Sequence, residues 1–279
     1  MRLVDAQVHI WGADTPARPW PAGGAATAHR VRPVTADETL AVLDAAGVHR
    51  AVLVPPSWEG DRNDLAWAAA ALHPDRLAVM GRVPLTGPAD AGRLVGWRSR
   101  PGSLGIRLTL HREPWLSRFR SGDLDWFWSA ANSAALPVMV YAPGLSAELG
   151  EVAGRFPDLS LIVDHLAVPV DARAPEAFAH LTDLLALARH PRVAVKATAL
   201  PCHARLPFPF RDLHEPLERV FDAFGPRRMF WGSDWTRLPC PYRENVELFT
   251  EALTFLSPPD LRWVMGDAIL EWLNWPAAA

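Results

Sequence analysis

Lysine is almost absent from this chain. Of its 28 basic residues, 27 are arginine, and Lys196 is the sole lysine. Arginine therefore serves wherever a generic cation is enough, so a retained lysine can mark a place where a compact ammonium group matters. Chance survival of one surface lysine is the alternative explanation.

Three other absences exclude classes of protein. The longest apolar runs have the length of a strand and are too short to span a membrane. The net charge is −3 and no basic run occurs, which argues against nucleic acid as the main partner. The chain has two cysteines and its first residues enter a strand pattern at once, so we expect no signal peptide, reduced thiols and a cytoplasmic location.

The strand pattern predicts a single domain over residues 1–279. No Ser/Gly-rich or highly charged stretch divides the chain, and 49% hydrophobic residues suffice for a large core. Several strand candidates are continuous apolar runs, which is typical of strands buried on both faces of a parallel sheet. The candidates are 3–10, 50–55, 77–83, 104–109, 136–141, 159–164, 192–197 and 228–232.

Helix signals alternate with these strands. Thr35 and Glu38 form a capping-box pattern, Gly47 is a stop signal, and Ser257-Pro258 begins a last helix. Further helices are expected at about 62–73, 88–97, 123–134, 146–155, 175–190, 212–224 and 241–256. Eight such units predict the α/β class and a (β/α)8 TIM barrel. An open doubly wound sheet is the alternative, but no G-x-G-x-x-G follows the first strand.

Two long loops, 12–34 and 198–211, follow the first and seventh strands. Loops of this length in a compact fold are usually functional or disordered. In a barrel both would overhang the C-terminal face, which is where active sites form.

Polar side chains stand at the C-terminal ends of six predicted strands, which converge in a barrel. They are Gln7, His9, Arg107 followed by His111, Tyr141, Asp164-His165, Lys196 and Ser233-Asp234-Trp235. Singly, His9 could be a core histidine, and Asp164 or Asp234 could cap a turn. Together they indicate a functional site around one cavity. Asp164 is its weakest member, because it neighbours His165 and should point the opposite way.

Three segments resemble the amidohydrolase superfamily. They are residues 5–11 (DAQVHIW), 162–166 (IVDHL) and 231–235 (WGSDW), and the ending Gly266-Asp267-Ala268 is similar as well. The best match is the amidohydrolase-2 branch, which holds pyrone-dicarboxylate lactonase, sugar lactonases and aromatic-acid decarboxylases. The resemblance runs from residue 3 to about residue 274 and implies a barrel hydrolase.

The resemblance also implies roles for individual residues. His9 matches the second histidine of the branch's strand-one His-x-His pair, His165 its strand-six histidine and Asp234 its strand-eight aspartate. Arg107 and Lys196 fall where the lactonases hold substrate carboxylates.

Two departures argue against tight metal binding. Gln7 replaces the first histidine of the pair, and Tyr141 stands in strand five where the decarboxylases have a metal ligand. Zinc usually has three or four strong ligands. We therefore expect no cofactor. If zinc or manganese were bound, its ligands would be His9, His165 and Asp234.

The mechanism expected from these residues is metal-free hydrolysis of a carboxylate-bearing lactone or ester. Asp234 would activate water as the general base, with His9 and His165 as donors to the carbonyl oxygen. An organic acid or lactone is thus the expected small-molecule partner. The residues expected to bind it are Arg107, Lys196, Tyr141 and Gln7.

Three alternatives stay open. One is a zinc- or manganese-dependent amidohydrolase or aromatic-acid decarboxylase, and another is a catalytically silent binding barrel. A third is a thiolate metal site formed by Cys202, His203 and Cys240. The sequence leaves the substrate and the oligomeric state open, a homo-oligomer included.

Overall fold

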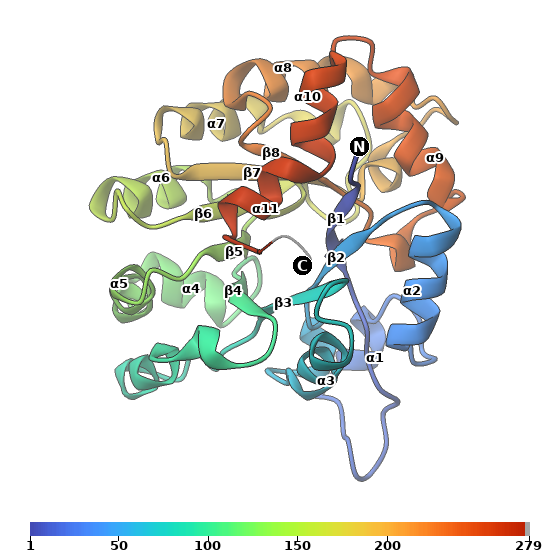
Figure 1. The fold of residues 1–279 in the computed structure, drawn as a ribbon. Coiled ribbons are helices and arrows are strands. Elements are labelled where there is room, and N and C mark those ends of the chain that lie inside the picture. The colour runs from blue at the N-terminus through green and yellow to red at the C-terminus, as the bar shows by residue number, and fades with distance from the viewer. Residues whose placement is uncertain (277–279) are drawn as a thin grey trace.

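A computed structural model, which describes residues 1–276, is an eight-stranded parallel barrel with helices outside it (Figure 1). The strands follow one another around the sheet in chain order, and each pairs in parallel with the next. They are β1 (Val4–Val8), β2 (Arg50–Leu53), β3 (Leu77–Gly81), β4 (Ser103–Thr109), β5 (Val138–Tyr141), β6 (Leu161–Val163), β7 (Val193–Thr198) and β8 (Met229–Gly232). The predicted barrel and all eight strand positions are confirmed.

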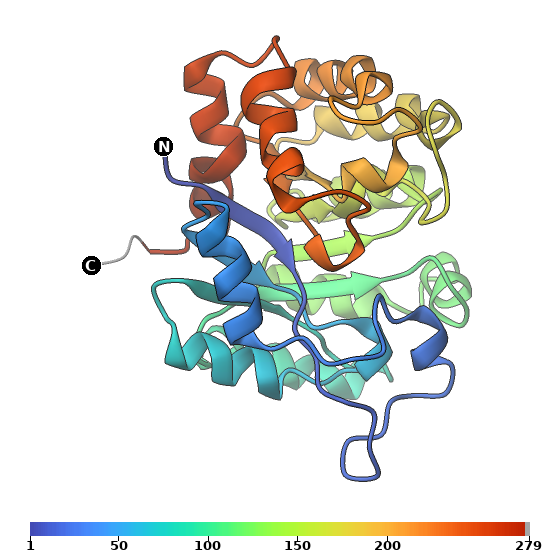
Figure 2. The ribbon, with the colours of Figure 1, turned by 90° about the vertical axis from the view of Figure 1, so that its right-hand side faces the viewer.

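The helices form the outer layer and bury the apolar faces of the strands. In Figure 2 the strands run away from the end of the barrel at which both termini lie. The helices are α1 (Gly24–Thr27), α2 (Ala36–Ala45), α3 (Asp64–Leu72), α4 (Trp115–Arg120), α5 (Asp125–Ser133), α6 (Ser146–Arg155), α7 (Leu181–Ala186), α8 (His214–Phe224), α9 (Tyr242–Glu247), α10 (Pro258–Arg262) and α11 (Ala268–Trp272). The caps agree with the sequence, because Thr35 accepts from the backbone N–H of Glu38 and Ser257 forms a capping box with Asp260.

One predicted helix, 88–97, is not an α-helix. The chain there forms two 3₁₀ turns, Pro88–Leu94 and Trp97–Ser99. Gly96 between them has φ 66°, in the left-handed region that glycine adopts without strain. The apolar spacing was compatible with a helix, but the glycines favour separate turns.

The barrel closes between β8 and β1 through a buried carboxylate. Asp5 Oδ1 accepts from the backbone N–H of Gln7 at 2.9 Å and of Ser233 at 2.8 Å. Its Oδ2 accepts from the Ser233 hydroxyl and, at 2.7 Å, from the Tyr242 hydroxyl. The backbone N–H of Asp234 also donates to the Gln7 carbonyl at 2.8 Å. Asp5 therefore fixes the end of β8 against β1, where two site residues follow.

A β-bulge decides which side chains of β1 face the barrel interior. Asp5 pairs with Ala51 and Val8 pairs with Leu53, so β1 contains one extra residue between these points. Val4 and Ala6 accordingly pack in the interior cluster, whereas Val8 packs in the outer layer. After the bulge it is Gln7 and His9 that turn inward.

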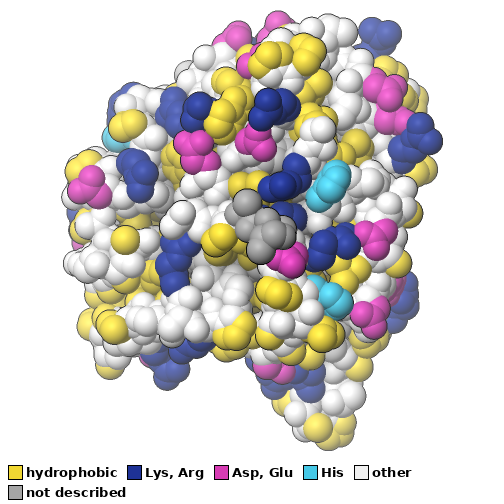
Figure 3. Space-filling view, in the orientation of Figure 1, with side chains coloured by type: hydrophobic (Ala, Val, Ile, Leu, Met, Phe, Trp, Pro, Cys, Tyr) yellow, Lys and Arg dark blue, Asp and Glu magenta, His cyan; other side chains and the backbone are white. Residues whose placement is uncertain are grey.

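The C-terminal helix closes the opposite end of the barrel. Ile269 and Leu273 join the interior cluster of strand residues, and the Arg50 guanidinium lies 4.4 Å from the centre of the Trp275 ring. Figure 3 views this face, on which arginine and acidic side chains are interspersed. Ligand access is thereby left to the C-terminal ends of the strands.

Within residues 1–276, no helix has the length and apolar character needed to cross a membrane.

The Asp5 junction makes a stability prediction that the two tyrosines can test. Tyr242→Phe should lower the free energy of unfolding in urea by about 1.5–3 kcal/mol, because its hydroxyl donates to a buried carboxylate. Tyr141→Phe is the matched control, since its hydroxyl donates at 2.9 Å to the neutral Val168 carbonyl and should cost about 1 kcal/mol. Equal losses in both variants would contradict the role given to Asp5.

Candidate active site

A cavity of about 290 Å³ lies at the C-terminal ends of the strands. Five of the residues expected to act in catalysis or substrate binding line it, namely His9, Arg107, Tyr141, His165 and Asp234. It is also lined by Ala26, Thr27, His29, Pro56, Ser57, Trp58, Thr109, His111, Arg112, Val170, Asp171 and Arg237. The structure thus brings most of the predicted site together, and it adds His29, Arg112 and Arg237.

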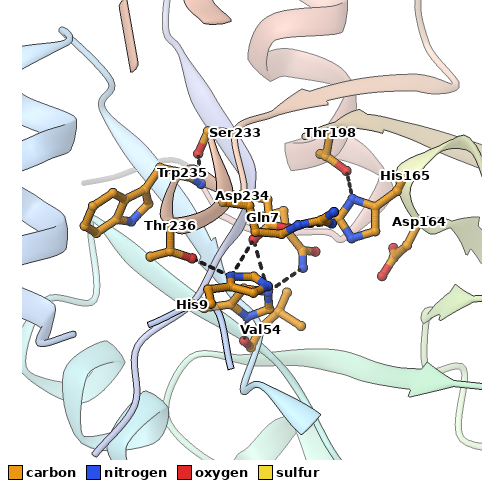
Figure 4. Close-up of polar contacts among 12 residues, drawn as sticks. Gln7, His9, Val54, Asp164, His165, Thr198, Ser233, Asp234, Trp235 and Thr236 are labelled. Carbon is orange, nitrogen blue, oxygen red and sulfur yellow. Dashed lines mark hydrogen bonds and ion pairs between the residues drawn. The ribbon is translucent and has the colours of Figure 1, made fainter. Parts of the chain in front are cut away.

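His9 follows β1 and is buried, with both ring nitrogens occupied (Figure 4). Its Nδ1 lies within hydrogen-bond distance of the Val54 carbonyl, which can only accept, so Nδ1 carries the proton. Its Nε2 lies 3.1 Å from the Gln7 side-chain nitrogen. Nε2 also lies 3.2 Å from Asp234 Oδ1, so neither ring nitrogen is left to donate to a substrate carbonyl, which differs from the donor role expected for His9.

Asp234 begins the turn after β8 and is held in the left-handed region at φ 51°. Its Oδ1 lies 3.2 Å from His9 Nε2 and 3.9 Å from His29 Nδ1, yet it has no hydrogen-bond partner among the residues that the structure describes. Burial alone would raise the pKa of this carboxyl, but His9, His29 and the Arg237 guanidinium hold it well below its usual range. Asp234 is therefore an ionised, buried carboxylate with one free oxygen.

His29 is one of the three site residues that the sequence analysis missed. It lies in the long loop after β1, and its Nδ1 is 2.7 Å from the Thr236 hydroxyl. Burial lowers the pKa of His29 to about 3, so the ring is neutral near pH 7. The only sequence signal was the length of loop 12–34, which predicted an overhang of the site without indicating which residue enters it.

His165 and Asp164 both face inward because the chain turns left-handed after β6. His165, Leu166 and Ala167 have φ of 52°, 52° and 55°. Such backbone is costly for non-glycine residues and is concentrated at functional sites. The turn brings His165 over the cavity, with Nδ1 2.7 Å from the Thr198 hydroxyl. Asp164 was expected to point away from the site, but it lies beneath the cavity floor.

Lys196 lies beneath the same floor and does not line the cavity. Its ammonium is fully buried, 2.9 Å from Asp164 Oδ1, and it donates to Gln7 Oε1. Arg107 donates to the other Asp164 oxygen at 3.1 Å. The two cations hold the pKa of Asp164 below its usual range although burial alone would raise it. The expectation that Lys196 anchors a substrate anion is therefore replaced, because Asp164 already neutralises its charge.

Gln7 is likewise fully buried and lies outside the cavity lining, so it does not occupy the substrate-binding position expected for it. Its amide oxygen faces Lys196 and its amide nitrogen faces His9. Gln7 thus connects the buried ion pair below the floor with the histidine above it.

The wall of the cavity is cationic. Arg107 Nη1 donates to Thr109 at 2.7 Å, and Arg237 Nη1 lies 3.6 Å from Asp234 Oδ2. The Arg112 guanidinium stands at the rim and has no hydrogen-bond or ion-pair partner among residues 1–276. These guanidinium groups make the cavity suited to an anionic ligand.

Two neutral side chains complete this wall. Burial lowers the pKa of His111 to about 4 and raises the pKa of Tyr141 to about 12, so both are uncharged near pH 7. The Tyr141 hydroxyl donates to the Val168 carbonyl at 2.9 Å. It can accept from a ligand while that bond is kept, but protonating a leaving group would require breaking it.

Residues 4–275 match the sequence profile of the amidohydrolase family. The chain belongs to this family. It is a hydrolase that resembles the lactonases within the family, as its sequence motifs predicted. An L-fucono-1,5-lactonase from Burkholderia ambifaria is 30% identical over 247 residues, which are 83% of this chain and 79% of that protein.

Solved structures confirm the fold. A zinc-bound amidohydrolase from Burkholderia multivorans is 24% identical with a TM-score of 0.84, covering 99% of this chain and 100% of that one. A probable 2-pyrone-4,6-dicarboxylic acid hydrolase from Acinetobacter baumannii, with citric acid bound, is 20% identical with a TM-score of 0.75, covering 98% and 100%.

Because the Burkholderia multivorans relative binds zinc, we ask whether the residues of this site fit a metal. Donor atoms of His9, His29 and Asp234 lie within 4.8 Å of one another, so His29 takes the place expected for His165. However, the Gln7 amide N–H already occupies the His9 Nε2 lone pair. Without that nitrogen only two donors remain, fewer than zinc sites use. The arrangement as it stands does not fit a tightly held metal.

The thiolate site considered from the sequence does not form among residues 1–276. Cys202 and Cys240 are free cysteines, and Cys202 Sγ donates to the Arg237 carbonyl at 3.3 Å. His203 Nδ1 lies 2.9 Å from the Ala172 carbonyl. The cysteines and His203 do not gather into a metal-capable cluster in the described part of the chain.

The buried ion pair predicts how the sole lysine contributes to stability. Lys196→Met should lower the free energy of unfolding by about 3 kcal/mol or more, because it leaves the Asp164 carboxylate buried with one cation fewer. The double variant Lys196→Met/Asp164→Asn should recover part of this loss. Urea unfolding measures both. A Lys196→Met protein as stable as the wild type would contradict the pairing.

Proposed function

We propose that this protein hydrolyses a carboxylate-bearing lactone, with water activated by Asp234 and without a tightly bound metal. The observation that carries the proposal is the Asp234 carboxylate, which is ionised, buried and part of the cavity lining, and whose Oδ1 has no hydrogen-bond partner among residues 1–276. A general base needs such an oxygen within reach of the water that it deprotonates. The lactonase relative supports the reaction class.

In the proposed reaction, water attacks the lactone carbonyl while its proton passes to Asp234. The resulting tetrahedral intermediate expels the ring oxygen, and the protonated Asp234 returns the proton to that oxygen. The product is a hydroxy acid, and no proton is gained or lost overall. The low pKa of Asp234 makes it a modest base, so a reactive lactone or ester suits it better than an amide.

His165 is the proposed donor to the oxyanion. The Thr198 hydroxyl has no other hydrogen-bond partner among the described residues, so we assign it as donor to His165 Nδ1. The ring proton then lies on Nε2, where it can stabilise the charge that develops on the carbonyl oxygen. Burial lowers the pKa of His165 to about 3, so it acts as a neutral donor. We assign His9 a supporting part, packed against Asp234 at 3.2 Å.

The substrate carboxylate is assigned to the arginine wall. Arg107 lies deep in the cavity and Arg112 at its rim, and a guanidinium binds a carboxylate through two parallel hydrogen bonds. The Tyr141 ring, which packs against His111 and His165, is assigned to orient the lactone ring. The citric acid bound to the Acinetobacter baumannii relative is consistent with an acidic ligand in this fold.

A metal-dependent hydrolase or decarboxylase is the second candidate. It is favoured by the proximity of the His9, His29 and Asp234 donor atoms and by the zinc in the Burkholderia multivorans relative. It would require Gln7 to release His9 Nε2. The metal titration described below separates the two candidates.

The base is tested by Asp234→Asn. We expect kcat on lactones, such as L-fucono-1,5-lactone and 2-pyrone-4,6-dicarboxylate, to fall by roughly 10²–10⁴-fold, because the amide cannot accept the proton. Asp171→Asn is the control, since Asp171 also lines the cavity but has no role in the reaction. Near-normal turnover in Asp234→Asn, with the unfolding midpoint unchanged, would remove Asp234 from the mechanism.

The arginine wall is tested by comparing an acidic with a neutral lactone. Arg112→Gln should raise KM for 2-pyrone-4,6-dicarboxylate by about tenfold or more, since a charge-assisted hydrogen bond contributes about 1.5–3 kcal/mol. KM for the neutral L-fucono-1,5-lactone should change little in the same variant. An equal effect on both substrates would show that Arg112 does not recognise the carboxylate.

A further inference from the structure

We propose that a buried chain of three side chains, Asp164, Lys196 and Gln7, excludes divalent metal from this active site. It does so by holding an amide N–H on the His9 nitrogen that a metal would need. The inference deepens the metal-free part of the proposed function, but it concerns the enzyme without substrate and can be tested separately from catalysis.

The ammonium of Lys196 fixes which way the Gln7 amide points. An ammonium group has three donors and no acceptor, so only the amide oxygen of Gln7 can face it. The amide nitrogen must then face the other way, where it lies 3.1 Å from His9 Nε2. Turning the amide over would place an NH₂ group against a buried cation, which is strongly unfavourable.

The hydrogen bond at His9 Nδ1 determines whether Nε2 can accept from the Gln7 amide. The Val54 carbonyl holds a proton on Nδ1, and the Gln7 NH₂ group, which has no acceptor, requires a lone pair on Nε2. Asp234 Oδ1, 3.2 Å from the same nitrogen, then contacts it without a hydrogen bond. An imidazole nitrogen has a single lone pair in the ring plane. The hydrogen bond from Gln7 and a bond to a metal therefore compete for the same position.

Asp164 keeps the ammonium in place. Lys196 has no exposed surface, and its Nζ lies 2.9 Å from Asp164 Oδ1, 3.4 Å from the Ala6 carbonyl and 3.3 Å from Met139 Sδ. A buried ammonium stays charged where such a carboxylate neutralises it. The lysine is thus locked below the floor, and the amide above it cannot reorient cheaply.

The inference differs from the simpler view that Gln7 is a ligand lost from a histidine pair. If Gln7 were only a missing ligand, an apolar side chain in its place would leave zinc affinity unchanged. If Gln7 blocks His9, removing its N–H without adding a ligand should increase affinity. Gln7→Leu separates these two cases.

The experiment is calorimetric titration of chelator-stripped protein with zinc. We expect the wild type to bind weakly and well below one equivalent after dialysis. Gln7→Leu should bind roughly tenfold more tightly, a factor that corresponds to about 1.4 kcal/mol. Gln7→His should bind more tightly still, because it also adds an imidazole beside His9. Gln7→Met, which also removes the N–H and adds no nitrogen or oxygen ligand, serves if the leucine variant does not fold; it should gain affinity as well.

Two controls locate the effect. Adding His9→Asn to Gln7→Leu should abolish the gain, which shows that zinc binds at His9 and not at another histidine. Long-range ¹⁵N NMR of the histidine rings in the metal-free wild type, assigned with His9→Asn, should show His9 protonated at Nδ1. In a well-folded Gln7→Leu protein, the Nε2 resonance should shift as its donor is lost.

Stoichiometric, dialysis-resistant zinc in the wild type would overturn the inference. So would a folded Gln7→Leu or Gln7→Met protein that binds zinc no more tightly than the wild type. Neither result depends on turnover. If no lactone is hydrolysed but the titrations behave as expected, the proposed function fails and the metal exclusion stands.

Discussion

The organisation of this active site depends on an ammonium group buried inside the barrel. The charge of Lys196 cannot stay there unpaired, so Asp164 must turn inward to meet it, and Arg107 shares the same carboxylate. Among the residues that the structure describes, Lys196 also donates to the Gln7 amide oxygen, whose position then sets the hydrogen bond to His9. The orientation of Gln7, and through it the contact made by His9, is thus set by this neutralisation below the floor.

Much of the fold could be predicted from the sequence because it follows from repeated, local signals. Eight apolar runs separated by helical patterns permit few arrangements, and the structure confirms the barrel. Two features escaped prediction because they depend on single residues in three dimensions. The bulge that turns Gln7 and His9 inward leaves no composition signal. The Asp5 junction that closes the barrel joins residues 228 and 237 positions apart in the chain.

The sequence predicted which residues form the candidate site better than it predicted what each residue does there. Residue type and strand position were enough to bring His9, His165 and Asp234 to one cavity. The singular lysine correctly marked a special position, but a sequence does not show whether a cation faces a ligand or a carboxylate. Asp164 was placed on the wrong side because strand alternation ends at the left-handed turn of His165. His29 lies in the long loop after β1, and that loop has no hydrophobic periodicity from which its position could be predicted.

The buried cation also bears on which reactions the site can support. A metal ion would polarise a carbonyl strongly enough for poor leaving groups, whereas an amide N–H on His9 supplies no Lewis acid. What remains is an ionised Asp234 of low pKa, one neutral histidine donor and a wall of guanidinium groups. Such a set stabilises an anion well and removes protons weakly. Under the proposed function, its substrate would be an activated, ring-strained or enol ester that carries its own negative charge, because such a substrate brings both the binding energy and the leaving group.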